Sequence, residues 1–281
     1  MPLRLLVVAT ETAEQCNARR QFAGLASHET YEKTLRILDD SAEIAHVSCV
    51  DHRDPLTIDQ LHAFDGIFFA GSPIQMHDDS AEARSAVSFM QSVFAAGTPS
   101  FGSCAGLQIA AVAAGGKTAP RSHGIEAGFA RDVMVTEEGR THPMLAGRPP
   151  VFDAPAMHSS VVETLPPGAK LLASNKHTPV EAVEIHHANG VFWGVQYHPE
   201  ITIGEVAASL RRQSSELVEQ GLASDDAAVE AHAERLEALH QDPGRQDIAW
   251  QLGLDVETTD ATRRTTELRN FLRFLKDRSK L

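Results

Sequence analysis

The first half of the chain alternates short apolar runs with segments whose apolar residues recur at helical spacing. Continuous apolar runs such as residues 3–9 suit strands that are buried on both faces. The expected strands are 3–9, 43–50, 66–70 and 99–101, and the expected helices are 30–38, 81–96 and 107–114. Because strands and helices alternate, the pattern predicts an α/β fold: an open, mostly parallel sheet with helices on both faces.

The pattern changes between residues 121 and 194. Short strand signals at 133–135, 171–173 and 180–185 are separated by proline-rich turns. A stronger run, 191–197, is rich in aromatic and β-branched residues. We therefore expect an antiparallel portion inserted before a last strand at 191–197.

From residue 204 onward the pattern is helical. One helix is expected over 204–220 with a stop at Gly221, and Ser224 is the expected N-cap of the next helix. The apolar positions that should line one side of the later helices are Val229, Ala233, Leu236, Leu268, Phe271, Leu272 and Leu275. We divide the chain into an α/β domain, 1–203, and a helical C-terminal extension, 204–281. The extension either packs on the core or forms a dimer surface or a lid.

Composition narrows the classes of partner and ligand. The net charge of −13 argues against nucleic acid or an anionic membrane, and no apolar run approaches the length of a membrane span. Three cysteines do not make a disulfide framework; together with the lack of a signal-peptide pattern, they favour the cytoplasm. The fourteen histidines are scattered without metal-ligand spacing, and no nucleotide-binding loop is present. We expect no metal and no cofactor.

The strongest chemical signal is Cys104, which lies between Gly102 and Gly106. A strand signal precedes it and good helix material follows it, so the segment predicts a tight strand-to-helix turn that presents a nucleophile. The positive end of the helix dipole favours the thiolate there. A lone cysteine is more often a small buried side chain, and we expect that of Cys16 and Cys49.

A matching base follows the last predicted strand. His198 and Glu200 are two residues apart, so on a strand end they share one face and the carboxylate can orient the imidazole. Nucleophile, base and orienting carboxylate then predict a Cys-His-Glu triad and acyl transfer through a thioester.

These segments resemble the class I, triad-type glutamine amidotransferases, including the glutaminase portion of GMP synthetase. The family pattern G-x-C-x-G-x-Q matches 102–108, and V-Q-x-H-P-E matches 195–200. A turn that is Gly-Gly-Pro-like in the family is present as 71–73, with Ser72 at the second glycine. The resemblance covers 3–203, implies a flavodoxin-like catalytic domain, and implies that the backbone N–H groups of Ser72 and Ala105 form an oxyanion hole.

The resemblance also implies where the substrate binds. Its amino-acid end is expected near Gly71, Gln108, His158, Ser159 and Gln196. The family often has Ser-His-Gly-Asp where this chain has residues 157–160, so the common aspartate is replaced by Ser160.

Three functions remain open from the sequence. The chain is a hydrolase of γ-glutamyl amides, a glutaminase subunit that feeds ammonia to a separate synthase or ligase, or a silent relative used for binding or regulation. The intact triad argues against the third. The small Ala105 beside the nucleophile leaves room for a leaving amine larger than ammonia and favours the first. The amine, the partner and any homo-oligomer are not predicted.

Overall fold

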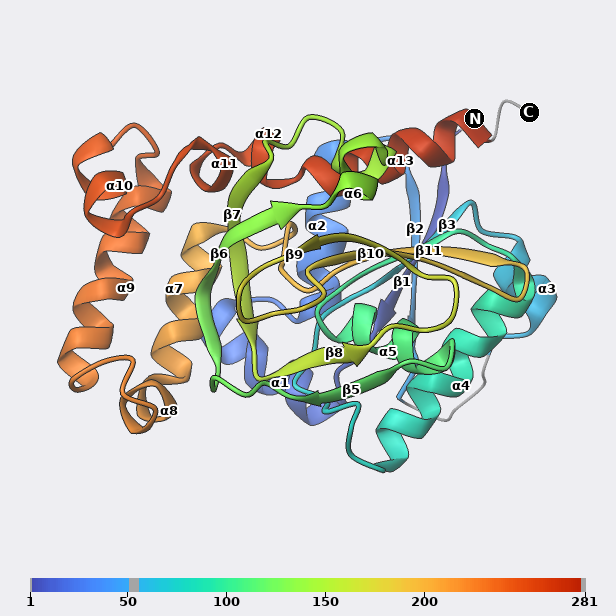
Figure 1. Ribbon diagram of the computed structural model, residues 1–281, viewed down its shortest axis with the longest axis horizontal. Helices are drawn as coiled ribbons and strands as arrows, with labels where there is room; N and C mark the ends of the chain where they lie inside the picture. Colours follow the sequence, from blue (N-terminus) through green and yellow to red (C-terminus); the bar gives the residue numbers. More distant parts are fainter. Residues whose placement is uncertain (1, 51–55, 279–281) are drawn as a thin grey trace.

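The computed structural model describes residues 2–50 and 56–278 and contains a large mixed sheet (Figure 1). The order of its nine described strands is β2-β1-β3-β4-β11-β10-β9-β6-β7. The strands that run parallel are β2 (Glu43–Ser48), β1 (Arg4–Ala9), β3 (Gly66–Phe69), β4 (Ser100–Ser103) and β11 (Gly190–Val195). The α/β fold is therefore confirmed.

The antiparallel portion is also confirmed, and it extends the same sheet. It comprises β10 (Ala182–His187), β9 (Lys170–Ser174), β6 (Glu126–Val135) and β7 (Val151–His158). Two further strands, β5 (Lys117–Pro120) and β8 (Ser160–Thr164), form a small separate sheet. Strand β7 was not predicted, because Pro155 lies within it and a proline in a sequence argues against a strand.

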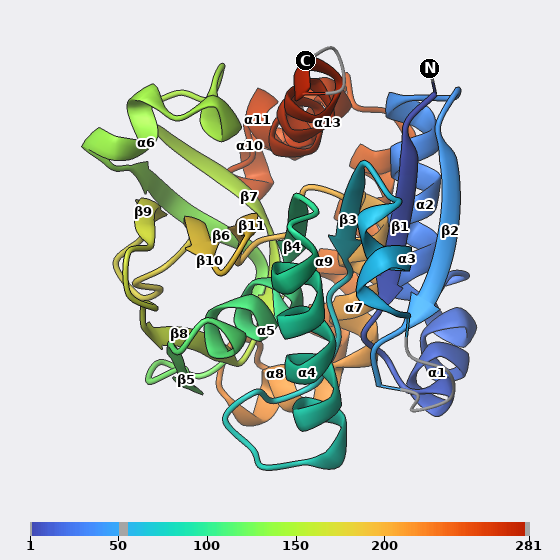
Figure 2. The same cartoon turned by 90° about the vertical axis from the view of Figure 1, so that its right-hand side faces the viewer.

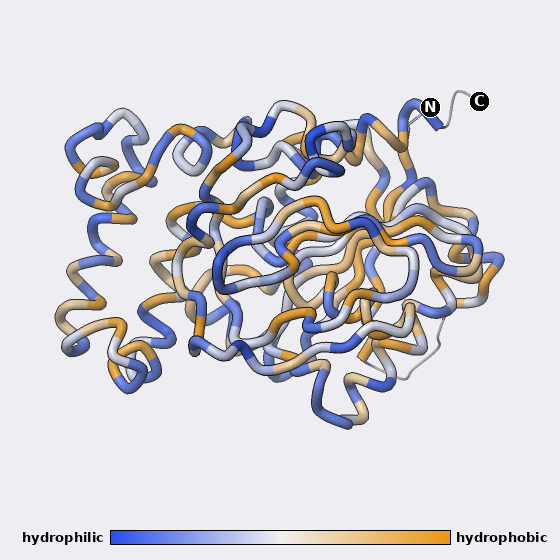
Figure 3. The backbone as a smooth tube through the Cα atoms, viewed as in Figure 1, coloured by the Kyte–Doolittle hydropathy of each residue, from blue (hydrophilic) through white to orange (hydrophobic). Residues whose placement is uncertain are grey.

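Helices cover both faces of the parallel half (Figure 2). On one face, α4 (Ala81–Ala96) and α5 (Ala105–Ala113) bury apolar side chains against β1 and β3. On the other face lie α2 (Ser27–Leu38) and the last helix, α13 (Thr266–Arg278), whose Phe271 packs on Phe68 and Phe101. Apolar residues are concentrated along the central strands in Figure 3. The segments that carry Gly71, Cys104 and His198 follow β3, β4 and β11, which are neighbours in this sheet.

The other helices differ in part from the sequence expectation. They are α1 (Ala13–Ala23), α3 (Ile58–His62), α6 (Glu137–Thr141), a 3₁₀ turn (Pro143–Leu145), α7 (Ile203–Arg212), α8 (Ser214–Glu219), α9 (Asp226–Gln241), α10 (Gln246–Leu252), α11 (Val256–Thr259) and α12 (Ala261–Arg264). The single helix expected over 204–220 is two helices that meet at Gln213. Asp225, not Ser224, caps α9, because its carboxylate accepts the N–H of Ala228 at 2.8 Å.

The helices after residue 203 pack on the core, the first of the roles expected for them. Arg148, whose side chain is 1% exposed, pairs with Glu267 of α13 at 2.7 Å and with Glu257 of α11 at 2.9 Å. The Tyr197 hydroxyl also donates to Glu267 at 2.9 Å. Within the described part of the chain, no helix has both the length and the apolar character that crossing a membrane requires.

Candidate active site

Cys104 occupies the predicted turn between β4 and α5. Its backbone has φ 53° and ψ −109°, a conformation that costs energy for a residue with a side chain. A Cβ on Gly102 would lie 2.9 Å from the carbonyl carbon of Gly106, and one on Gly106 would lie 2.7 Å from the oxygen of Phe69. Only glycine fits these two positions. The turn is held to β11 by the Cys104 N–H, which donates to Val195 O at 2.8 Å.

His198 and Glu200 follow β11, the strand next to β4, and form the expected pair. Nδ1 of His198 lies 2.7 Å from Oε1 of Glu200, whose side chain is 3% exposed. The backbone N–H of His198 donates to Pro155 O at 2.7 Å. Burial alone lowers the pKa of His198, but the interactions with Glu200 and Cys104 outweigh it and raise this pKa to about 10. The site thus favours a proton on the imidazole.

Three residues that were not assigned to the site from the sequence support Glu200. Ser103 donates its hydroxyl to Oε2 of Glu200 at 2.9 Å, and the Tyr31 hydroxyl makes a short contact with Ser103 Oγ. Thr34 of α2 donates to the Glu200 carbonyl at 3.0 Å. The position of Ser103 directly before the nucleophile was the available signal; Tyr31 and Thr34 lie in the helix expected over 30–38, and nothing local connects them to Glu200.

The 71–73 turn lies against the catalytic pair. A Cβ on Gly71 would come within 2.7 Å of Cε1 of His198 and 3.6 Å of Cβ of Cys104. Ser72 and Ala105 line the same cavity as Cys104. Among residues 2–50 and 56–278, neither of their N–H groups has a hydrogen-bond acceptor. This placement is compatible with an oxyanion hole, which stays a prediction.

The expected substrate-binding residues fall into two groups. Gly71, Gln108, His158 and Ser159 line the cavity, whereas Gln196 is fully buried. Gln108 donates to Ser160 O at 3.0 Å and to Oε1 of Gln196 at 3.2 Å.

The ring of His158 is engaged on both nitrogens. They lie 2.9 Å from Ser160 O and 2.8 Å from Oε2 of Glu126. Gln196 therefore lies behind the cavity wall, whereas His158 lines the cavity with both ring nitrogens already engaged. The substrate-binding roles themselves stay predictions.

The cavity has a volume of about 420 Å³. One part of its wall comes from α5 and the strands β7 and β8, with Gln108 and residues 157–160. Another part comes from α1, α7 and α8, and its polar members are Glu11, Gln15, Arg19, Ser27, Ser209, Arg212, Gln213 and Glu216. None of the residues of this second wall was predicted from the sequence.

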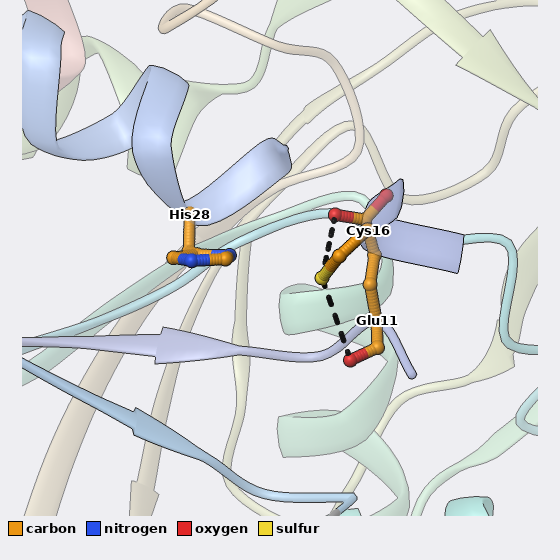
Figure 4. A group of neighbouring side chains, drawn as sticks. All are labelled: Glu11, Cys16 and His28. Atoms are coloured by element: carbon orange, nitrogen blue, oxygen red, sulfur yellow. Dashed lines mark hydrogen bonds between the residues drawn. The ribbon is translucent and has the colours of Figure 1, made fainter. Parts of the chain in front are cut away.

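Glu11 of the second wall lies close to Cys16 and His28, and all three are residue types that bind metals (Figure 4). Their ligand atoms are within 4.8 Å of one another. Glu11 Oε2, however, accepts the N–H of Ser27 at 2.8 Å and contacts the Cys16 sulfur at 3.8 Å. Burial and the nearby Glu11 raise the pKa of Cys16 to about 11, so the thiol keeps its proton. Hydrogen bonds join Glu11 to Cys16 and Ser27, whereas Nδ1 of His28 is buried without a partner among the described residues. As expected, Cys16 and Cys49 are both buried.

Comparison with known proteins agrees with this geometry. The model of the family "Glutamine amidotransferase class-I" matches residues 32–215. A γ-glutamyl-L-1-hydroxyisopropylamide hydrolase from a Pseudomonas species is 36% identical over 222 residues, which are 78% of this chain and 75% of the relative. A glutamine-hydrolysing GMP synthase from Neisseria gonorrhoeae is 28% identical over 172 residues, which are 60% of this chain but only 31% of that protein.

Solved structures show the same fold. A glutamine amidotransferase from Thermotoga maritima superposes with a TM-score of 0.64 at 13% identity and covers 98% of both chains. Another glutamine amidotransferase, from Methylobacillus flagellatus, gives a TM-score of 0.59 at 16% identity over 97% of this chain and 94% of the other. Both likenesses include the helices after residue 203, so that part of the chain has structural counterparts too.

Proposed function

Because this chain belongs to the class I glutamine amidotransferase family, we propose that it hydrolyses a γ-glutamyl carboxamide through a thioester on Cys104. The observation that carries the proposal is the strained turn that presents Cys104 beside the His198–Glu200 pair. A buried carboxylate bonded to the distal nitrogen of an imidazole is the arrangement that supports general-base catalysis next to a nucleophile.

The proposed reaction proceeds in two halves. His198 accepts the thiol proton, and the sulfur attacks the amide carbon. The N–H groups of Ser72 and Ala105 stabilise the oxyanion, and His198 then protonates the leaving nitrogen. Water, activated by the same imidazole, hydrolyses the γ-glutamyl thioester. Glu200 keeps the ring oriented and stabilises its charged form throughout.

We favour a γ-glutamyl amide of a larger amine over glutamine as the substrate. The relative from Pseudomonas carries such an activity in its name. In addition, helices α1, α7 and α8 of this chain supply their own wall beside the nucleophile, which gives a leaving group somewhere to bind. A side chain larger than that of Ala105 would reduce this room.

A second candidate is a glutaminase subunit that delivers ammonia to a synthase. The GMP synthase relatives favour it, since the matched region is about a third of their length and the remainder of each is available for another reaction. In that case glutamine would be cleaved well only after a partner is added.

The test is release of amine or ammonia from glutamine and from a panel of γ-glutamyl amides, with no partner present. The proposal expects turnover of substituted amides by the wild type and none by Cys104→Ala. If the wild type cleaves only glutamine, the glutaminase subunit becomes the better account. If it cleaves neither, the chain is a silent member of its family.

A further inference from the structure

Two arginines face the cavity from its second wall. Arg19 lies on α1 and Arg212 at the end of α7, and these helices pack against each other (Figure 1). Burial, followed by the charge of Arg19, lowers the pKa of Arg212. Two guanidinium groups that line one cavity favour an anion between them.

The carboxylates of Glu11 and Glu216 act on Arg212 through space, but neither is bonded to it. Within the described residues, neither Arg19 nor Arg212 has an ion pair or hydrogen bond, and Nε of Arg19 is buried without a partner. By contrast Arg211, the residue just before Arg212 in α7, pairs with Glu230 at 2.8 Å and with Glu237. Both guanidinium groups at the cavity are therefore free to bind an anionic ligand.

The carboxylates of the same wall have donors of their own. Glu11 accepts the Ser27 N–H at 2.8 Å, and Glu216 accepts Nε2 of Gln220 at 3.1 Å. The hydrogen-bonding groups without a partner at this wall therefore belong mainly to the two arginines. Oε1 of Gln213, the other buried polar atom without a partner in this part of the described chain, offers an acceptor to a donor group of the same ligand.

The second wall, which carries Arg19 and Arg212, adjoins His198 and not the Gln108 end of the cavity. Glu200 is held by Thr34 of α2, and Thr30 of the same helix donates to Glu205 of α7 at 2.7 Å. Helices α2 and α7 therefore flank the His198–Glu200 side of the nucleophile. Because His198 must protonate the leaving nitrogen, the amine lies on that side of the sulfur.

We propose that Arg19 and Arg212 form a subsite for an anionic leaving group, so that the preferred substrates are γ-glutamyl amides whose amine carries a carboxylate. This inference rests on the proposed function and specifies its substrate class. A guanidinium group binds a carboxylate through paired, charge-assisted hydrogen bonds, which a neutral or cationic amine cannot accept.

The experiment compares leaving groups of similar size and different charge. The amides are those of glycine and β-alanine (anionic), ethanolamine (neutral) and ethylenediamine (cationic). Each is assayed with the wild type, Arg19→Met, Arg212→Met and the matched control Arg211→Met, whose lost charge faces α9. Turnover of the neutral amide reports on folding of each variant.

We expect the wild type to prefer an anionic amide by at least about tenfold in kcat/KM, and each cavity variant to lose about ten- to a hundredfold on that substrate alone. Arg211→Met should change all substrates alike. Equal losses on all amides in the cavity variants, or a preference for the neutral or cationic amide, would overturn the subsite while leaving amide hydrolysis intact.

Binding separates the subsite from the chemistry. Calorimetry with Cys104→Ala and γ-glutamylglycine should show affinity that falls about tenfold or more when Arg212→Met is added. Arginine-dependent binding without turnover by the wild type would refute the proposed hydrolysis and keep the subsite. Binding that ignores the arginines would refute the subsite.

Discussion

Replacing Glu200 with Gln keeps the shape of the triad and removes its charge. In the structure Glu200 accepts hydrogen bonds from both sides, from His198 at 2.7 Å and from Ser103 at 2.9 Å. A glutamine can accept from only one of them through its oxygen. If the oxygen faces His198, the amide N–H₂ group meets the Ser103 hydroxyl, which can rotate to accept, so the fold should survive.

The magnitude follows from the pKa of His198. Its rise from the ordinary 6.5 to about 10 corresponds to roughly 5 kcal/mol in favour of the imidazolium. Glu200 is the largest of the causes that raise this pKa. Because losing a charge-assisted hydrogen bond costs about 1.5–3 kcal/mol, Glu200→Gln should lose about 10- to 150-fold in kcat/KM. His198→Ala should lose more, because it removes the proton acceptor itself.

The assay is the pH profile of kcat/KM for both proteins with one γ-glutamyl amide. A raised pKa keeps the imidazolium up to high pH, so the alkaline limb of the wild type should lie near 10 and move to lower pH in Glu200→Gln. The stabilisation of the folded state by this ion is complete below about pH 6.5 and is lost as pH rises through 10. An unchanged rate and an unchanged alkaline limb in Glu200→Gln would refute the assigned role.

Three other substitutions test separate parts of the account. Gly71→Ala should push the His198 ring away by several tenths of an ångström and lower kcat by about ten- to a hundredfold with the melting temperature unchanged. The control Gly244→Ala, in a distant turn, should leave kcat unchanged. Equal activities of the two variants would show that the 71–73 turn tolerates the methyl group. Ser103→Ala should reduce kcat/KM by about tenfold, less than Glu200→Gln, and a larger loss would mean that Ser103 does more than orient the carboxylate. Arg148→Met should lower the free energy of unfolding in urea by about 3–5 kcal/mol, because it leaves the buried carboxylate of Glu267 without a counter-ion, whereas Glu257 keeps Arg263. A loss under about 1 kcal/mol would contradict the docking of α13 through Arg148 and Glu267.

Local signals in the sequence predicted the parallel half of the fold and the positions of the triad residues. The strands before Gly71 and His198 are strongly apolar, and the glycines on both sides of Cys104 mark the turn after the short strand at 100–103, so the ends of all three strands could be identified. Helix α1 was missed because its composition is polar and only Cys16 is buried in it. It carries Arg19, so one side of the cavity was missed with it.

Long-range contacts account for the remaining omissions. The wall that brings Arg19 beside Arg212 exists only because α1 packs on α7, and no local pattern encodes that contact. His158 shows the same limit from the other direction: its motif position suggests a substrate contact, whereas tertiary hydrogen bonds to Ser160 and Glu126 already occupy its ring.

The most direct test of the central claim is to trap the γ-glutamyl thioester. Wild-type enzyme mixed with a good γ-glutamyl amide and quenched in acid within a turnover should gain the mass of one glutamyl group, and peptide mapping should place it on Cys104 and not on Cys16 or Cys49. The adduct should be absent from Cys104→Ala. An adduct elsewhere, or amide hydrolysis by folded Cys104→Ala at the wild-type rate, would contradict covalent catalysis at this residue.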